Sequence, residues 1–332
     1  MSVSVLLLKQ RWGEQLEFSV SFEAISLALV ATFFYSAGGI TSKYMVGSVK
    51  SSTHVLLLQM VINFIFLVVV AAGLLSVGFY DLNDFLDPKA MLVTAVVGLF
   101  TFAGLVTFYQ GMATGDMSVG GVVLSAKVIF GVLIGFLFLG ERFDLLIYVL
   151  ILVVLVGVLL VSWEPNISLK NFFLFTGSGA HWFLVTIFLW AVGDGMVTAL
   201  GNSYALIPLL LFRGLIILAC LIPLYGWLNK RVSGGIPLRE SLNRRTLGGA
   251  LFMVFLLLTA DFFFVYALGM SLTLSQAMGT LEGVMVFFMV LALSQSLHLR
   301  ERLGEPIDRQ TITIRFVGVV VSTVGAMGII FA

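Results

Sequence analysis

The sequence has little charge, since Asp, Glu, Lys and Arg make up 11% of its 332 residues, against roughly 25% in soluble domains. Hydrophobic residues reach 60%, which is more than a soluble chain of this length could hide in a core. The net charge is only +1, which argues against a nucleic-acid partner. We therefore expect a protein whose main solvent is lipid.

Residues that build disulfides, metal sites and nucleotide sites are also scarce. A single cysteine, Cys220, excludes an internal disulfide. Three scattered histidines, His54, His181 and His298, do not indicate a metal site. No G-x-x-x-x-G-K-[ST] loop is present, which argues against ATP hydrolysis. We expect no metal, no cofactor and no enzyme, because a membrane-embedded enzyme would need a nucleophile with a base or a metal cluster.

Long apolar runs dominate what is there. A membrane-spanning helix needs about 20 mostly apolar residues, and the runs predict ten of them, at 22–47, 54–78, 90–113, 117–139, 144–163, 180–201, 204–228, 246–270, 273–297 and 312–331. Residues 1–21 contain four charges and read as an interfacial helix or a disordered segment. Residues 164–179 form a polar linker between a first half, 22–163, and a second half, 180–332.

Two short motifs suggest that the halves are copies of one unit. Gly140-Glu141-Arg142 and Arg300-Glu301-Arg302 each close an apolar run and precede another. Five spans per half is an odd number, so the halves must insert in opposite directions. The predicted fold is an all-α integral membrane protein with ten transmembrane helices in two inverted five-helix repeats, and its binding site is expected near the midplane between the halves.

Three further segments align between the halves in the same order. The matched pairs are Tyr35-Ser-Ala-Gly38 with Trp190-Ala-Val-Gly193, Leu57-Leu-Gln59 with Leu211-Phe-Arg213, and Tyr109-Gln-Gly-Met112 with Ala267-Leu-Gly-Met270.

These features resemble the drug/metabolite transporter superfamily of EamA-like type. The resemblance rests on Tyr35…Gly38…Lys43, on the very short turn between the third and fourth spans, and on Phe136–Arg142 before a span with Gly157. The second copy, Leu291–Arg302 with Gly318 and Gly325, departs by placing Arg300 where a glycine is usual. Gln59 stands where a basic residue is frequent, and the prolines common midway along the fourth and ninth spans are absent. The resemblance implies both termini in the cytoplasm, whereas the loop Lys and Arg residues favour the opposite orientation.

Five ionisable side chains fall inside the predicted spans. If all five faced lipid unpaired they would cost about 12–17 kcal/mol, so we expect them to face inward. They are Lys127, Asp194, Arg213, Asp261 and Glu282.

Lys127 and Glu282 lie at similar depths on the corresponding fourth and ninth spans. The sequence favours their pairing, either as a structural salt bridge or as a substrate site. In the second interpretation, Lys127 binds an anionic or carbonyl group, and Glu282 binds an amine or a coupling proton.

The other three charges leave alternatives open. Asp194 lies between Gly193 and Gly195, a pattern typical of close packing between membrane helices, of a binding site or of a hinge. Asp261 and Arg213 are natural partners for an ion pair. If they do not pair, Asp261 becomes the favoured proton carrier.

Several aromatic residues carry polar groups close to these charges. Tyr35, Tyr109, Trp190 and Tyr266 are therefore candidates for the wall of a binding cavity. Gly131 and Gly135, four residues apart, predict close contact with another helix, within the chain or across a homodimer.

The expected function is secondary active transport of a small polar or zwitterionic, amino-acid-like metabolite, with a proton as candidate coupling ion. The partners would be this small molecule and the lipid bilayer. One alternative is a flippase for a lipid or lipid-linked sugar, and another is a nontransporting receptor or assembly protein. The compact loops favour the bacterial inner membrane as the location.

Overall fold

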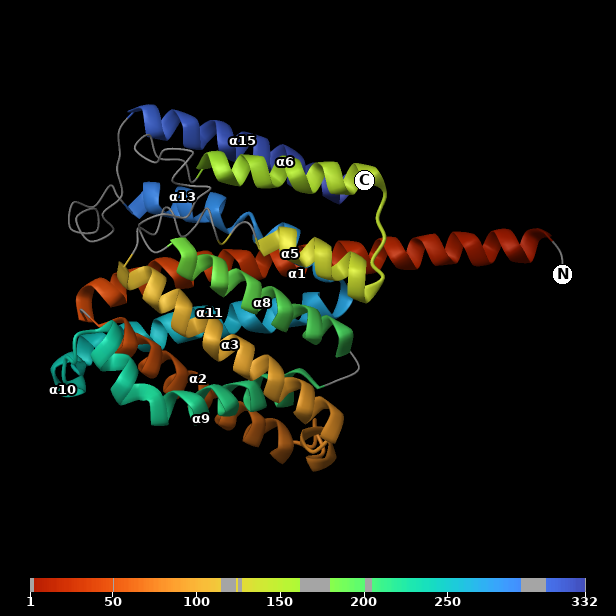
Figure 1. The fold of residues 1–332 in the computed structure, drawn as a ribbon. Coiled ribbons are helices and arrows are strands. Elements are labelled where there is room, and N and C mark those ends of the chain that lie inside the picture. Colours follow the sequence, from red (N-terminus) through yellow and green to blue (C-terminus); the bar gives the residue numbers. More distant parts are fainter. Residues whose placement is uncertain are drawn as a thin grey trace.

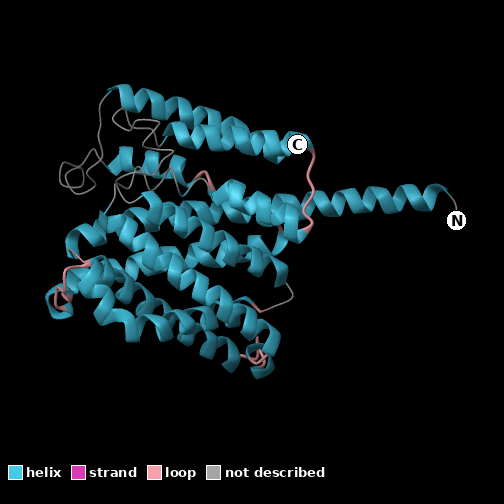
Figure 2. Ribbon diagram, in the orientation of Figure 1, coloured by secondary structure: helices cyan, strands magenta, loops and turns pink. Residues whose placement is uncertain are grey.

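The computed structural model describes residues 3–49, 51–114, 124, 127–161, 180–200, 205–293 and 309–331, and within these ranges every regular element is a helix (Figures 1 and 2). The longer helices are α1 (Val3–Val49), α2 (Ser52–Ser76), α3 (Pro88–Thr114), α5 (Lys127–Ile134), α6 (Leu145–Val161), α8 (Ala180–Leu200), α9 (Leu206–Val232), α11 (Arg244–Met270), α12 (Leu272–Gly279), α13 (Glu282–Leu293) and α15 (Arg309–Phe331). Two short elements, η1 (Leu82–Phe85) and α10 (Leu238–Ser241), lie in connections, and a π-helical turn, η2 (Gly135–Leu139), continues α5.

Six of these helices are long and apolar enough to cross a membrane. They cover Phe22–Val49, Ser52–Ser76, Pro88–Ala113, His181–Leu200, Leu206–Val232 and Arg244–Met270. Shorter apolar helices cover Lys127–Leu139, Leu145–Gly157 and Phe316–Ile329. Large apolar side chains such as Phe138 and Leu145 are about four-fifths exposed on the outside, as a lipid-facing surface requires. The protein is therefore an all-helical, multi-pass membrane protein, while the ten-span inverted repeat stays a prediction.

The helices begin and end where short polar residues and glycine satisfy the free backbone groups. The Ser51 hydroxyl accepts a hydrogen bond from the His54 amide at the start of α2, and Asn243 does the same for Thr246 at the start of α11. Gly140, with φ of 71°, ends η2 in the left-handed conformation that favours glycine. These caps explain why the observed ends lie close to those expected from the sequence.

Two differences from the predicted elements stand out. The segment 1–21, expected to be separate, contributes residues 3–21 to the same continuous helix as the first span, and this part of α1 projects from the bundle (Figure 1). The span expected at 273–297 is divided, because α12 ends at Gly279 and α13 begins at Glu282. The division places Glu282 at the first turn of a helix.

Helices α6 and α15 lie side by side along one edge of the bundle (Figure 1). Glycine makes this contact close: a Cβ on Gly157 would lie 2.7 Å from the Gly318 carbonyl oxygen, and one on Gly325 would lie 2.9 Å from the Val154 nitrogen. Any side chain at these positions would push the backbones apart. In the rest of the bundle, α1 packs along α11, and α3 packs against α8 and α9.

Candidate functional site

A cavity of about 220 Å³ lies among the helices, and no side chain that the structure describes on α6 or α15 lines it. Residues of α1, α2, α3 and α5 from the first predicted half line it together with residues of α8, α9, α11, α12 and α13 from the second. Its polar wall includes Tyr35, Ser42, Gln59, Asn63, Thr101, Tyr109, Lys127, Trp190, Asp194, Arg213, Asp261, Gln276, Thr280 and Glu282. All five ionisable residues expected to face inward therefore meet at one cavity.

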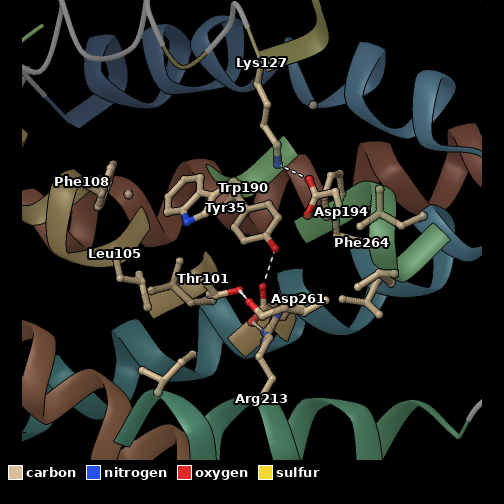
Figure 3. A pocket seen from close by; sticks show the side chains of 18 of the residues that line it. Tyr35, Thr101, Leu105, Phe108, Lys127, Trp190, Asp194, Arg213, Asp261 and Phe264 are labelled. Carbon is tan, nitrogen blue, oxygen red and sulfur yellow. Dashed lines mark hydrogen bonds and ion pairs between the residues drawn. The ribbon is translucent and has the colours of Figure 1, made fainter. Parts of the chain in front are cut away.

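The Lys127 ammonium forms an ion pair with Asp194, which corrects the predicted pairing with Glu282 (Figure 3). Lys127 comes from the first turn of α5 and Asp194 from the middle of α8, and about a fifth of each side chain is exposed, to the cavity that both line. The Asp194 Oδ2 atom also accepts a hydrogen bond of 3.1 Å from the Gln276 amide nitrogen. Asp194 is thus held by two donors from two different helices.

Aromatic rings surround the Lys127 ammonium. Its Nζ atom lies 5.1 Å from the ring centre of Phe264 and 5.9 Å from that of Trp190. Both distances are within the range at which a cation is attracted to the face of an aromatic ring. The cavity thus already holds one ammonium group between a carboxylate and two aromatic rings.

A second ion pair joins Arg213 of α9 to Asp261 of α11, as the sequence favoured. The Tyr35 hydroxyl donates a 2.5 Å hydrogen bond to Asp261 Oδ1, while Arg213 binds Oδ2. Figure 3 shows Tyr35 between the two ion pairs, with its hydroxyl directed at Asp261 and Lys127 beyond its ring. Whether the Arg213–Asp261 pair is structural or takes part in coupling stays a prediction.

The remaining predicted aromatic positions separate into two groups. Tyr109 and Trp190 line the cavity with Tyr35, and the buried Tyr109 hydroxyl donates a 2.5 Å hydrogen bond to Gln59 Oε1. Tyr266 is 40% exposed on the outside of α11 and does not line the cavity, so its predicted place in the wall is wrong. Tyr266 lies five residues after Asp261, which carries it round the helix to another face.

Two amide side chains of the wall, Gln276 and Asn63, were not predicted from the sequence. Gln276 is 97% buried and binds Asp194, and Asn63 of α2 also lines the cavity. Both amides lie within apolar spans, where a polar group without a hydrogen-bond partner is costly. The same criterion that singled out the charged residues, applied to amides, would have found them.

The paired glycines of α5 and η2 face α12 of the same chain. A Cβ on Gly131 would lie 2.6 Å from Gln276 Cδ, and one on Gly135 would lie 2.6 Å from Thr273 Oγ1. The neighbour that the sequence left open is therefore within the chain. By contrast, α8 runs unbroken through Gly193-Asp194-Gly195, and Gly195 packs against Ile134, so close packing explains that glycine.

The Glu141 carboxylate joins the two predicted halves. Its oxygens accept hydrogen bonds from the backbone amides of Leu272 at 2.7 Å and Thr273 at 2.9 Å, which are free donors at the start of α12. The motif that first indicated a repeat thus has a physical task, which is to cap a helix of the other half. Its second copy, Arg300-Glu301-Arg302, lies outside the described residues.

The fold and cavity define an all-helical membrane protein with charged groups gathered inside its spans. Residues 22–163 match the model of the EamA-like transporter family. This match confirms, for the first half of the chain, the resemblance predicted from the sequence.

A solved structure has a similar fold over most of the chain. A solved structure titled "Crystal structure of protein" has 13% sequence identity to this chain, and the match covers 94% of each chain with a TM-score of 0.58. Identity this low shows a shared fold alone. The comparison with curated proteins gives no match.

Proposed function

We propose that the protein is a secondary active transporter that moves a small polar or zwitterionic, amino-acid-like metabolite by alternating access. The observation that carries the proposal is the cavity lined by helices of both predicted halves, with Lys127, Asp194, Arg213, Asp261 and Glu282 in its wall. Charged groups inside membrane spans are costly and are typical of substrate and ion pathways. A site between two inverted repeats is also where alternating access operates on its substrate.

The wall suits a small molecule that carries charge. The cavity wall contains carboxylates, cations and amides together with the aromatic rings of Phe108, Trp190 and Phe264. Its volume of about 220 Å³ lies below the roughly 300–1,000 Å³ of pockets for drug-sized ligands. A proton is the candidate coupling ion because three carboxylates share the cavity. We place the protein in the bacterial inner membrane as part of the same proposal.

The first test is thermal stabilisation of the purified protein by a panel of amino acids, amines and organic acids. A ligand at a hundredfold excess over its dissociation constant stabilises the folded state by about 2.7 kcal/mol. We expect at least one compound to stabilise the wild type and to lose this effect in Lys127→Ala. The matched control is Lys89→Ala, because Lys89 is exposed at the start of α3, away from the cavity.

The stabilising compound is then tested for flux into proteoliposomes. Flux by the wild type and Lys89→Ala but not by Lys127→Ala supports the proposal. Equal flux in all three would remove Lys127 from the site. If no water-soluble compound stabilises or crosses, a lipid or lipid-linked sugar becomes the favoured cargo, and flipping of a fluorescent lipid by the same proteoliposomes checks that alternative.

A further inference from the structure

The charges in the cavity wall do not balance. Its cations, Lys127 and Arg213, are paired with Asp194 and Asp261. Within the described parts of the chain, the third carboxylate, Glu282, has no ion pair and no side-chain hydrogen bond, although it lies within electrostatic range of Lys127. An uncompensated carboxylate inside a membrane protein is costly. A bound cation would therefore compensate the negative charge of Glu282.

The space beside Glu282 is open because Gly39 of α1 has no side chain. A Cβ built on Gly39 would lie 3.7 Å from Glu282 Oε1, and Gly39 itself lines the cavity. Adding any longer side chain at this position would occupy the volume next to the carboxylate. A small cationic group can therefore approach Glu282 from the side of α1.

The predicted alignment of the two halves allows Glu282 and Gly39 to be compared with Lys127 and Asp194. The match of Tyr35–Gly38 with Trp190–Gly193 aligns Gly39 with Asp194, while Lys127 and Glu282 lie at similar depths on the corresponding fourth and ninth spans. Lys127 of the first half forms an ion pair with Asp194 of the second half. Glu282 of the second half has Gly39 of the first half beside it, so among the described residues this carboxylate has no cationic partner.

We propose that Glu282 binds the ammonium group of the transported molecule in the space beside Gly39. The proposal rests on the transport function above and narrows the cargo to amines and amino acids. Their ammonium group supplies the positive charge that the cavity lacks. Tyr35 lies one helical turn before Gly39 on the same face of α1 and contributes aromatic surface to the same wall.

A cargo recognised only through an anionic group fits this wall less well. Lys127 and Arg213 are already engaged, so binding a substrate carboxylate through either would release Asp194 or Asp261 from its partner. Breaking such a pair leaves an uncompensated charge. An ammonium group at Glu282 requires neither pair to break.

The test compares three probes of similar carbon skeleton: 3-methylbutylammonium, 3-methylbutanol and 4-methylpentanoate. Binding to the purified full-length protein is measured by calorimetry. We expect the amine to bind the wild type about tenfold or more tightly than the alcohol or the acid. Glu282→Gln should reduce the amine's affinity to that of the alcohol. The matched control, Glu240→Gln, changes an exposed carboxylate on α10 outside the cavity and should keep the wild-type affinity.

The Gly39→Ala variant gives a second test of the site, which is steric and leaves the charge of Glu282 unchanged. Its methyl group would face Glu282, so it should weaken the N-trimethylated form of the probe more than the primary amine, by about tenfold in the ratio of affinities. A folded, monodisperse Glu282→Gln protein that still binds the amine like the wild type would overturn the proposal. So would equal binding of the acid and the amine, an unchanged ratio in Gly39→Ala, or failure of the wild type to bind the amine at all.

Transport distinguishes this inference from the function on which it rests. If proteoliposomes carry a metabolite that lacks an ammonium group, the transport function stands and the ammonium site fails. If the amine binds with the expected dependence on Glu282 but no compound that binds is carried, the site stands and the transport function fails.

Discussion

The Lys127 ammonium and the Asp194 carboxylate form an ion pair across the cavity, from helices α5 and α8 of the two predicted halves. The same ammonium faces the rings of Trp190 and Phe264. The pair therefore joins the halves at the cavity itself, and its rupture would change both the charge of the cavity and the contact between the halves.

The first prediction concerns the coupling of these two residues. Lys127→Met and Asp194→Asn should each destabilise the protein by about 1–3 kcal/mol, because each leaves a partner unpaired. The double variant should be less destabilised than the sum of the two, with a coupling energy of about 0.5–3 kcal/mol. Unfolding in detergent measures the three values. Strictly additive effects would show that the ion pair does not contribute to stability.

The helical fold could be predicted from the sequence because apolar length and terminal caps are local properties. Ser51 and Asn243 act directly on the backbone amides that follow them, so the starts of α2 and α11 can be inferred from short segments. The division between α12 and α13 could not be, because residues 273–293 are mostly apolar and contain no proline. Thr280, which lies at the break, is buried in the bundle, so its surroundings come from helices distant in the sequence.

The sequence predicted which ionisable residues line the cavity, but it did not predict all of their ion-pair partners. The cost of a charge in lipid required the five ionisable residues to face inward, and all five do. The identity of each partner depends on which helices are neighbours and how each is rotated. Depth along the helix made Glu282 a reasonable partner for Lys127, whereas the packing of α5 against α8 brings Asp194 to it.

The second prediction concerns the helix cap that links the halves. Glu141→Ala removes the acceptor for the Leu272 and Thr273 amides and should destabilise the protein by about 1–2 kcal/mol. Hydrogen exchange at the first turn of α12 should become faster, since its amides lose their protein partner. Glu240→Ala is the control, because that exposed side chain caps no such helix. Unchanged exchange at Leu272 and Thr273 would contradict the prediction.

The third prediction separates a tyrosine inside the cavity from one outside it. Tyr35→Phe removes the hydrogen bond to Asp261 and should cost about 1 kcal/mol of stability. It should also weaken binding of the transported compound, because the hydroxyl orients a carboxylate of the cavity wall. Tyr266→Phe makes the same chemical change on the outer surface of α11 and should change neither property. Melting curves and binding titrations of the two variants test this, and an equal loss of binding in both would refute it.

The fourth prediction tests the close approach of α5 and α12 beside the site. A methyl group in Gly131→Ala would lie 2.6 Å from Gln276 Cδ, so the Gln276 side chain must move. Gln276 donates a hydrogen bond to Asp194, which also pairs with Lys127. When Gln276 is displaced, Asp194 loses this hydrogen bond and keeps the ion pair with Lys127. We expect lower stability, by about 1–3 kcal/mol, together with weaker binding of the transported compound. Gly226→Ala is the matched control, because a Cβ on this exposed residue of α9 would meet no atom within 4 Å, and alanine favours the helix by about 1 kcal/mol. If Gly131→Ala behaved like Gly226→Ala in both measurements, the contact between α5 and Gln276 would not position the site.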